Sequence, residues 1–135
     1  MNATSLVLTL FIAWTLLLLV LMEVLRSRLV VTGRMAPNAF QPDNANLSPF
    51  MQRLARAHAN CVESLPVFGG LLVVALVTGR AGVTDPLAPW LLAARVIQST
   101  IHLASLSPAA VTARFSAFAV QMAIDVYWVW ALLAR

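Results

Sequence analysis

The chain has 135 residues, of which 61% are apolar and only 10% are charged. Water-soluble proteins usually carry about a quarter charged residues, so this composition excludes a soluble surface and predicts an integral membrane protein. The length suits one domain over residues 1–135. The net charge of +4 fits a membrane surface, and no basic face with interleaved aromatic residues indicates nucleic acid binding. A single cysteine, Cys61, permits neither an internal disulfide nor a zinc motif, so we expect no metal site.

Four apolar segments are each long enough to cross the ~30 Å hydrocarbon layer of a bilayer as a helix. They cover residues 5–25, 60–78, 87–106 and 109–133. Between the second and third segments, residues 79–86 contain glycine, aspartate and proline and are expected to form a turn. The sequence therefore predicts an all-α bundle of four transmembrane helices.

Arginine is distributed unevenly among the connections. The first connection is long and polar, and its arginines and flanking arginines outnumber those on the opposite side of the membrane. Arg114 adds a further positive charge near the third connection. The positive-inside rule therefore places loops one and three in the cytoplasm and both termini outside. The compact chain, which has arginine but no lysine, favours a bacterial inner membrane. The arginines of the first connection and its flanks are Arg26, Arg28, Arg34, Arg53 and Arg56.

A stripe of polar side chains leads into the second apolar segment. Its members are three or four residues apart and share one helix face, since each residue turns the helix by about 100°. An ionisable side chain in lipid is costly, and it is a functional-site hypothesis by default. The stripe therefore indicates a polar ligand near the membrane surface. Its residues are Arg53, Arg56, Asn60 and Glu63.

The third and fourth segments carry similar stripes. Arg95, Gln98 and His102 share one face of the third, and Gln121 and Asp125 follow Arg114 on one face of the fourth. Arg95 and Asp125 lie at similar depth, so they either form an ion pair that ties the helices together or face a ligand. His102 either forms an interhelical hydrogen bond or contacts the ligand. Cys61 lies off the stripe and is expected to be a buried structural thiol.

This set of side chains suits a small zwitterion with more than one carboxylate. Glutathione has two carboxylates, one ammonium and one thiol, so arginines would bind its carboxylates and Glu63 its ammonium. A nearby cation lowers the pKa of a thiol, and the thiolate is the nucleophile. A second, lipophilic substrate would arrive from the bilayer.

The run Arg-Ala-His-Ala-Asn-Cys-Val-Glu at residues 56–63, with Arg53 before it and Pro66 after it, resembles the second-helix signature of the MAPEG family. That family comprises membrane-bound glutathione transferases, leukotriene C and prostaglandin E synthases, and a non-catalytic lipid-binding relative. The resemblance covers nearly the whole chain. It implies a four-helix bundle, a homotrimer, and glutathione bound between subunits near the cytoplasmic side.

The resemblance also implies roles for individual residues. His102 stands where a glutathione-contacting tyrosine is usual in the family. Arg114 is the candidate for the arginine that assists the thiolate in catalytic members, although it lies further from His102 than usual. Arg34 would match a contact from the first loop. The expected glutathione-binding residues are Arg34, Arg53, Arg56, Asn60, Glu63, Arg95, Gln98 and His102, with Arg114 as the catalytic residue.

Three functions remain open at this stage. The first is a membrane-bound glutathione transferase or peroxidase acting on lipophilic substrates. The second is a non-catalytic protein that binds lipid or glutathione, which the distant Arg114 and the missing tyrosine favour. The third is a small four-span multidrug exporter. The long first loop argues against an exporter, and so does the position of Glu23 at the end of the first span rather than at its centre.

Overall fold

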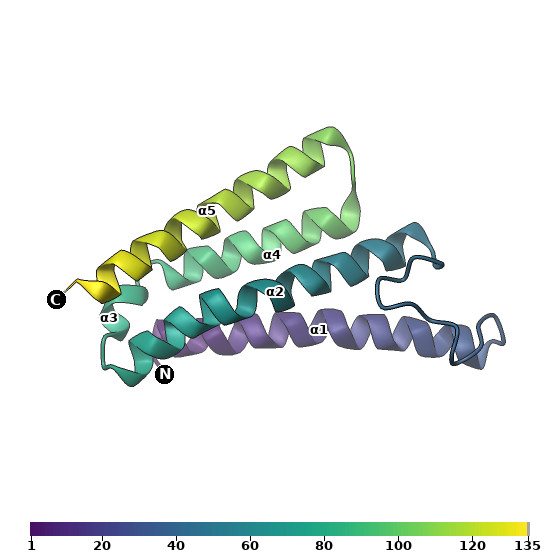
Figure 1. Ribbon diagram of the computed structural model, residues 1–135, viewed down its shortest axis with the longest axis horizontal. Helices are drawn as coiled ribbons and strands as arrows, with labels where there is room; N and C mark the ends of the chain where they lie inside the picture. Colours follow the sequence, from purple (N-terminus) through teal and green to yellow (C-terminus); the bar gives the residue numbers. More distant parts are fainter. Residues whose placement is uncertain (135) are drawn as a thin grey trace.

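The computed structural model describes residues 1–134, and this part of the chain contains helices and no strands. Its four long helices lie side by side in an elongated bundle (Figure 1). Both termini lie at one end, and the α1–α2 and α4–α5 connections lie at the other. The predicted all-α architecture is confirmed, with one short helix where only a turn was expected. The helices are α1 (Ala3–Val31), α2 (Pro49–Val77), α3 (Ala81–Thr84), α4 (Ala88–Ala104) and α5 (Pro108–Leu133).

The length and composition of three helices suit a membrane span. α1 and α2 have 29 residues each and α5 has 26, and all three are sufficiently apolar. The chain is therefore a multi-pass integral membrane protein. α4 has 17 residues, which corresponds to roughly 26 Å at the helical rise per residue. This is somewhat less than the hydrocarbon layer, so the fourth membrane crossing stays a prediction.

The second helix begins well before its apolar segment. α2 starts at Pro49, ahead of the apolar segment that begins at residue 60, because Ser48 accepts a hydrogen bond from the Met51 N–H at its first turn. Serine is favoured as an N-cap, and proline is favoured in the first turn, where its missing N–H has no helical partner. The first loop is therefore confined to residues 32–48, and the polar stripe from Arg53 to Glu63 lies on one continuous helix.

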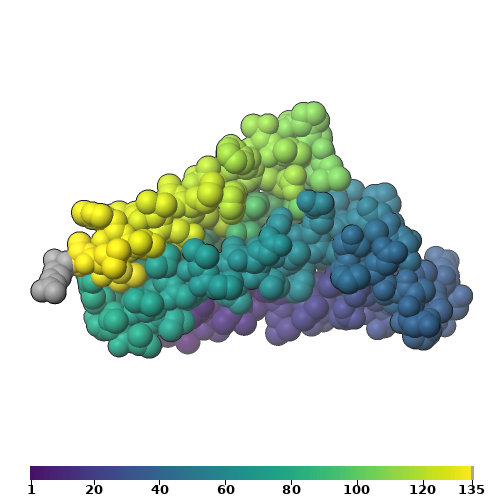
Figure 2. All heavy atoms as spheres, viewed as in Figure 1, coloured from purple at the N-terminus to yellow at the C-terminus, as the bar shows by residue number. Residues whose placement is uncertain are grey.

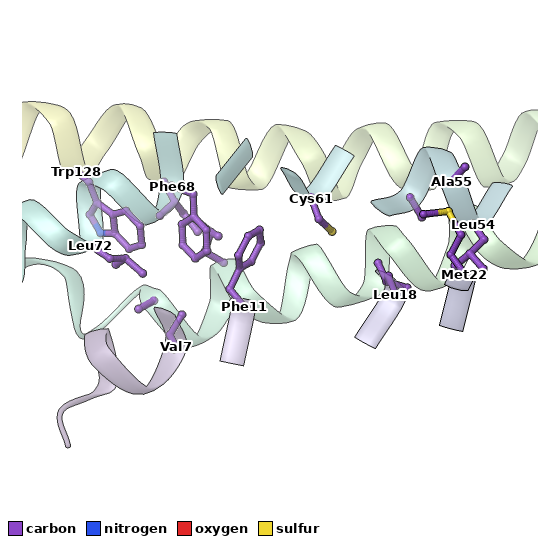
Figure 3. Close-up of a cluster of buried hydrophobic side chains, with 14 residues drawn as sticks. Val7, Phe11, Leu18, Met22, Leu54, Ala55, Cys61, Phe68, Leu72 and Trp128 are labelled. Atoms are coloured by element: carbon purple, nitrogen blue, oxygen red, sulfur yellow. The ribbon is translucent and has the colours of Figure 1, made fainter. Parts of the chain in front are cut away.

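An aromatic cluster closes the bundle toward the end that holds the termini (Figure 3). The rings of Phe11 and Phe68 meet edge to face with centroids 4.7 Å apart. Phe68 also stacks on Trp128 at 6.1 Å. Such aromatic pairs each contribute about 0.5–1.5 kcal/mol beyond the burial of their area. The cluster joins α1, α2 and α5.

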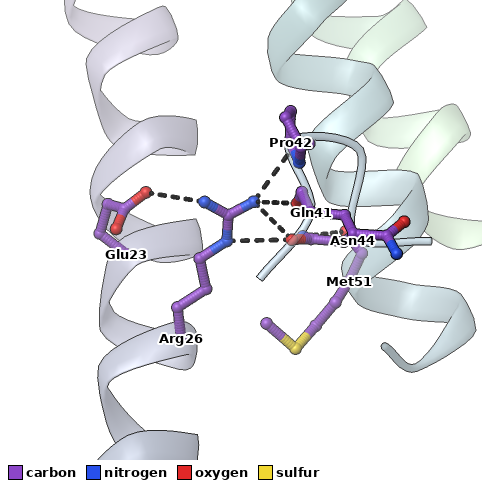
Figure 4. Close-up of polar contacts among 6 residues, drawn as sticks. All are labelled: Glu23, Arg26, Gln41, Pro42, Asn44 and Met51. Atoms are coloured by element: carbon purple, nitrogen blue, oxygen red, sulfur yellow. Dashed lines mark hydrogen bonds and ion pairs between the residues drawn. The ribbon is translucent and has the colours of Figure 1, made fainter. Parts of the chain in front are cut away.

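At the opposite end, Arg26 fixes the first loop (Figure 4). Its Nε and Nη2 groups donate to Asn44 Oδ1 at 2.9 and 2.6 Å, and Nη2 also donates to the carbonyl of Gln41 at 3.0 Å. Asn44 is buried at a positive φ of 56°, and its amide donates to the Met51 carbonyl at 2.8 Å. The loop is thereby tied to both α1 and the start of α2. Arg26 thus holds the first loop in place, and it also adds positive charge to the end of the bundle opposite the termini.

A second arginine caps a helix at the end that holds the termini. Arg80 donates to the carbonyls of Leu132, Ala131 and Ala134, at 2.6, 2.9 and 2.9 Å. The last carbonyls of a helix have no partner within the helix, and a cation there also interacts favourably with the helix dipole. Arg80 therefore fixes the end of α5 to the α2–α3 connection.

Candidate functional site

A cleft of about 530 Å³ opens between α2 and α5, with side chains of α4 at its base. Figure 2 shows the surface hollowed between the yellow-green α5 and the teal-blue α2. This volume lies within the range of sites for small molecules, about 300–1,000 Å³. The polar residues that line the cleft are Asn60, Glu63 and Ser64 of α2, Arg95 and Gln98 of α4, and Arg114 and Asp125 of α5.

The rim of the cleft is apolar and exposed. Phe115 is 64% exposed and Val67 is 58% exposed in the single chain. The α5 members follow the spacing i, i+4, i+7 and i+11, which places them along one face of the helix. A polar base beneath an apolar rim suits a ligand with both kinds of surface. The rim residues are Val67, Val111, Phe115, Phe118 and Met122.

Several charged atoms at the base have no protein partner. Arg95 is only 2% exposed, yet its Nε makes no hydrogen bond within residues 1–134. The same holds for Arg114 Nε and Asp125 Oδ1 in that part of the chain. Buried polar groups are normally paired, because an unpaired one loses its hydration without compensation. The three residues that carry these atoms all line one cleft, which indicates a site built for a polar ligand.

The ion pair considered for Arg95 and Asp125 is not formed. Within the described residues, the one ion pair shorter than 4.0 Å joins Arg26 to Glu23, at 3.5 Å. The Arg95 guanidinium instead lies 6.0 Å from the ring centroid of Phe11. The interpretation of Arg95 and Asp125 as a helix-tying pair is therefore wrong. Both face the cleft as separate charges, because matching depth on two helices does not fix the direction of either side chain.

The polar stripe of α2 divides into two parts. Asn60 and Glu63 line the cleft, whereas Arg53 and Arg56 do not. Arg53 donates from Nε to the carbonyl of Leu103 at 3.0 Å, and so caps the end of α4. Arg56 is exposed on the surface of the single chain. Only the half of the stripe that lies deeper in the bundle reaches the cleft.

The sequence matches the MAPEG family over residues 4–134, which is nearly the whole chain. The chain belongs to the MAPEG family. The resemblance seen at residues 56–63 is thereby confirmed. No curated protein and no solved structure matches the chain. Membership in the MAPEG family supports a glutathione-related function at the membrane at the level of the family.

The residues that the MAPEG resemblance implies fall into two groups in the structure. Five of them line the cleft, drawn from three helices. The other four do not line the cleft. They lie in the first loop, near the N-terminus of α2 and near the C-terminus of α4. The residues in the cleft are Asn60, Glu63, Arg95, Gln98 and Arg114, and those outside it are Arg34, Arg53, Arg56 and His102.

His102, at the position where the MAPEG resemblance leads one to expect tyrosine, is 2% exposed. Its Nδ1 lies 3.5 Å from Asn60 Nδ2, a long interhelical contact, and its Nε2 has no partner within residues 1–134. Of the two roles open for His102, the contact with Asn60 supports the interhelical one.

Two features of the cleft have no counterpart among the predictions from sequence. One is Ser64 of α2, and the other is the apolar rim. The apolar rim could have been found, because Phe115, Phe118 and Met122 continue one helical stripe beside Arg114. Cys61 is fully buried, as expected, with its Sγ 3.6 Å from Ser99 Oγ.

Proposed function

We propose that this protein binds glutathione in the cleft and uses its thiolate to conjugate or reduce lipophilic substrates. The observation that carries the proposal is the gathering of two guanidinium groups and two carboxylates in one cleft, with unpaired atoms on three of them. Glutathione offers two carboxylates, one ammonium and one thiol, so the two arginines and one of the two cleft carboxylates each have an opposite charge to meet. The cleft volume is adequate for a tripeptide of this size.

The roles of the charged residues follow from their positions. Arg95, at the buried base, would bind a carboxylate, for which the planar guanidinium is well suited. Glu63, near the open side of the cleft, would bind the ammonium. Arg114, on the first turns of α5, would hold the sulfur as thiolate, because a neighbouring cation favours the charged form.

The chemical step places the sulfur against an electrophilic carbon of the second substrate. The thiolate lone pair forms the S–C bond, and the leaving group departs with the electron pair of the bond that breaks. With a lipid hydroperoxide, the sulfur instead attacks the terminal oxygen, and the O–O bond breaks to release the lipid alcohol and leave the sulfenic acid of glutathione. The thiol of a second glutathione then attacks that sulfur, which releases water and forms glutathione disulfide. The apolar rim would admit such substrates from the bilayer.

The isolated chain leaves charges on faces that lipid would otherwise meet. Arg56 and Glu63 of α2 are both exposed in the single chain, and lipid cannot satisfy such groups. We therefore propose that neighbouring copies cover them in a homotrimer, with α4 as a fourth span. The arginine-rich end of the bundle, which holds the α1–α2 and α4–α5 connections, would face the cytoplasm of a bacterium. Both termini would lie on the outer side of the inner membrane.

Thermal stability of the purified protein with added glutathione tests the binding. A ligand that binds only the folded state stabilises it by about 2.7 kcal/mol at a hundredfold excess over its Kd. We expect a rise in Tm with glutathione and none with free cysteine at the same concentration. Glu63→Gln should reduce this rise, and Arg56→Ala should reduce it if a neighbouring copy places Arg56 at the site. The absence of any rise in the wild-type protein would contradict the proposal.

One observation favours a second candidate, a MAPEG protein that binds lipid or glutathione without turnover. The chain contains a single tyrosine, Tyr127, and it does not line the cleft. No phenolic hydroxyl of the same chain is thus available to the sulfur. Conjugation of a model aryl chloride by the purified protein separates the two functions, because only the enzyme would release chloride.

Two observations argue against the multidrug exporter. The chain belongs to the MAPEG family, and Glu23 pairs with Arg26 near the end of α1 rather than standing alone at mid-membrane.

A further inference from the structure

Two glutamines on adjacent helices form a buried pair behind the cleft. Gln121 of α5 is 3% exposed and does not line the cleft, whereas Gln98 of α4 is 8% exposed and does. Gln121 Nε2 donates to Gln98 Oε1 at 2.8 Å and to the carbonyl of Ala117 at 3.1 Å. Both hydrogens of the Gln121 amide are therefore used within the protein.

The direction of these hydrogen bonds follows from chemistry. The Ala117 carbonyl can only accept, so the Gln121 atom beside it must be the NH₂ group. That NH₂ group can in turn donate only to the oxygen of Gln98. A backbone acceptor thus fixes the orientation of Gln121, and Gln121 fixes the orientation of Gln98. With its oxygen held from behind, Gln98 is left with an NH₂ group that has no hydrogen-bond partner within residues 1–134 and lies in a residue lining the cleft.

We infer that Gln121 is a positioning residue that makes Gln98 a fixed hydrogen-bond donor in the cleft. An amide free to rotate could present either its oxygen or its nitrogen, and would accept from an ammonium or hydroxyl as readily as donate to an anion. The pair removes that choice. The cleft therefore selects a ligand that places a carbonyl or carboxylate oxygen at Gln98, which a peptide bond or a terminal carboxylate of a small peptide would supply. This inference rests on the proposed function, since it concerns the same cleft.

Side-chain amide NMR tests the orientation without any ligand. The chain has four glutamines, Gln41, Gln52, Gln98 and Gln121, so selective ¹⁵N labelling gives a short set of signals that substitutions can assign. We expect the Gln121 NH₂ to be protected from exchange with water and the Gln98 NH₂ to exchange faster. On addition of glutathione, the Gln98 signal should shift, while Gln41 and Gln52, outside the cleft, should not. Protection of Gln98 with rapid exchange at Gln121 would overturn the inference.

A double-mutant cycle tests the effect on binding. Gln121→Met keeps the length of the side chain and removes the donor, so it should weaken glutathione binding by about two- to tenfold, the usual worth of one neutral hydrogen bond. Gln98→Met should weaken it similarly, and the double variant should bind no more weakly than Gln98→Met alone. Ser116→Ala, on the same helix but outside the cleft, is the control and should bind normally.

The outcomes separate this inference from the proposed function. If the wild-type protein binds glutathione but Gln121→Met binds equally well, the inference fails alone. It also fails alone if the two losses add, because Gln121 would then act independently of Gln98. If the wild-type protein shows no glutathione-dependent shift or binding, the proposed function fails and the inference fails with it.

Discussion

Arg53 of α2 donates its Nε–H to the carbonyl of Leu103 at the end of α4, at a distance of 3.0 Å. The contact joins the second and fourth helices of the chain at the arginine-rich end of the bundle. It occupies an arginine that the polar stripe of the sequence predicts to bind glutathione. Within one chain, the guanidinium therefore acts first as a helix cap.

Replacement of Arg53 by methionine should lower stability more than glutathione affinity. A hydrogen bond from a charged group contributes about 1.5–3 kcal/mol, so we expect a clear fall in Tm, while affinity changes little. Arg28→Met is the matched control, because Arg28 is exposed on α1 and should have a small effect on both. A loss of glutathione binding at unchanged Tm would contradict the capping role and return Arg53 to the ligand site.

The two carboxylates of the cleft should differ in what they recognise. Glu63→Gln should weaken glutathione binding by roughly 10- to 100-fold, as expected for loss of a charged hydrogen bond, and should leave an analogue without the α-amino group unaffected. Asp125→Asn serves as the comparison and should not alter the preference between the two ligands. Calorimetric titration of each variant with glutathione and with the analogue measures both affinities. A preference lost in Asp125→Asn but kept in Glu63→Gln would reverse the assignment of the ammonium.

Arg114 should matter for turnover more than for binding. Loss of one group that stabilises developing or existing negative charge lowers kcat by about 10²–10³-fold in well-studied enzymes. We expect a reduction of this order for Arg114→Ala in conjugation of a model electrophile, with a much smaller change in the glutathione-induced Tm shift. Arg34→Ala, in the first loop, should retain turnover. Undiminished conjugation by Arg114→Ala would exclude Arg114 from the chemistry.

The apolar rim should set the preference for lipophilic substrates. Each buried methylene contributes about 0.8 kcal/mol, close to fourfold in affinity. In a series of electrophiles of increasing alkyl length, KM should therefore fall with length for the wild-type protein. Phe115→Ser should flatten this dependence, while Val126→Ser, which is exposed on α5 but outside the cleft, should not. An equal dependence in all three proteins would show that the lipophilic substrate binds elsewhere.

Much of the bundle and part of the site follow from sequence because both depend on helical periodicity. The spacing of Asn60 with Glu63, and of Arg95 with Gln98, placed each pair on one face, and all four line the cleft. The apolar segments likewise predicted the long helices. Periodicity identifies a helix face, and packing then turns that face toward its neighbours.

The remainder depended on contacts that leave little trace in sequence. The partner of Arg53 is a backbone carbonyl, and any residue could stand at Leu103. Proline is common in loops, yet Pro49 begins α2 because Ser48 caps the helix. Arg95 and Asp125 have matching depth, but their side-chain directions depend on the local packing, which places Arg95 beside Phe11.

A structure of the protein in lipid nanodiscs with saturating glutathione tests the central claim most directly. The account predicts the tripeptide in the cleft between α2, α4 and α5, with a carboxylate at Arg95 and the sulfur near Arg114. Glutathione bound elsewhere, for example in the hollow beside Glu23 and Arg26, with the cleft unchanged, would contradict it.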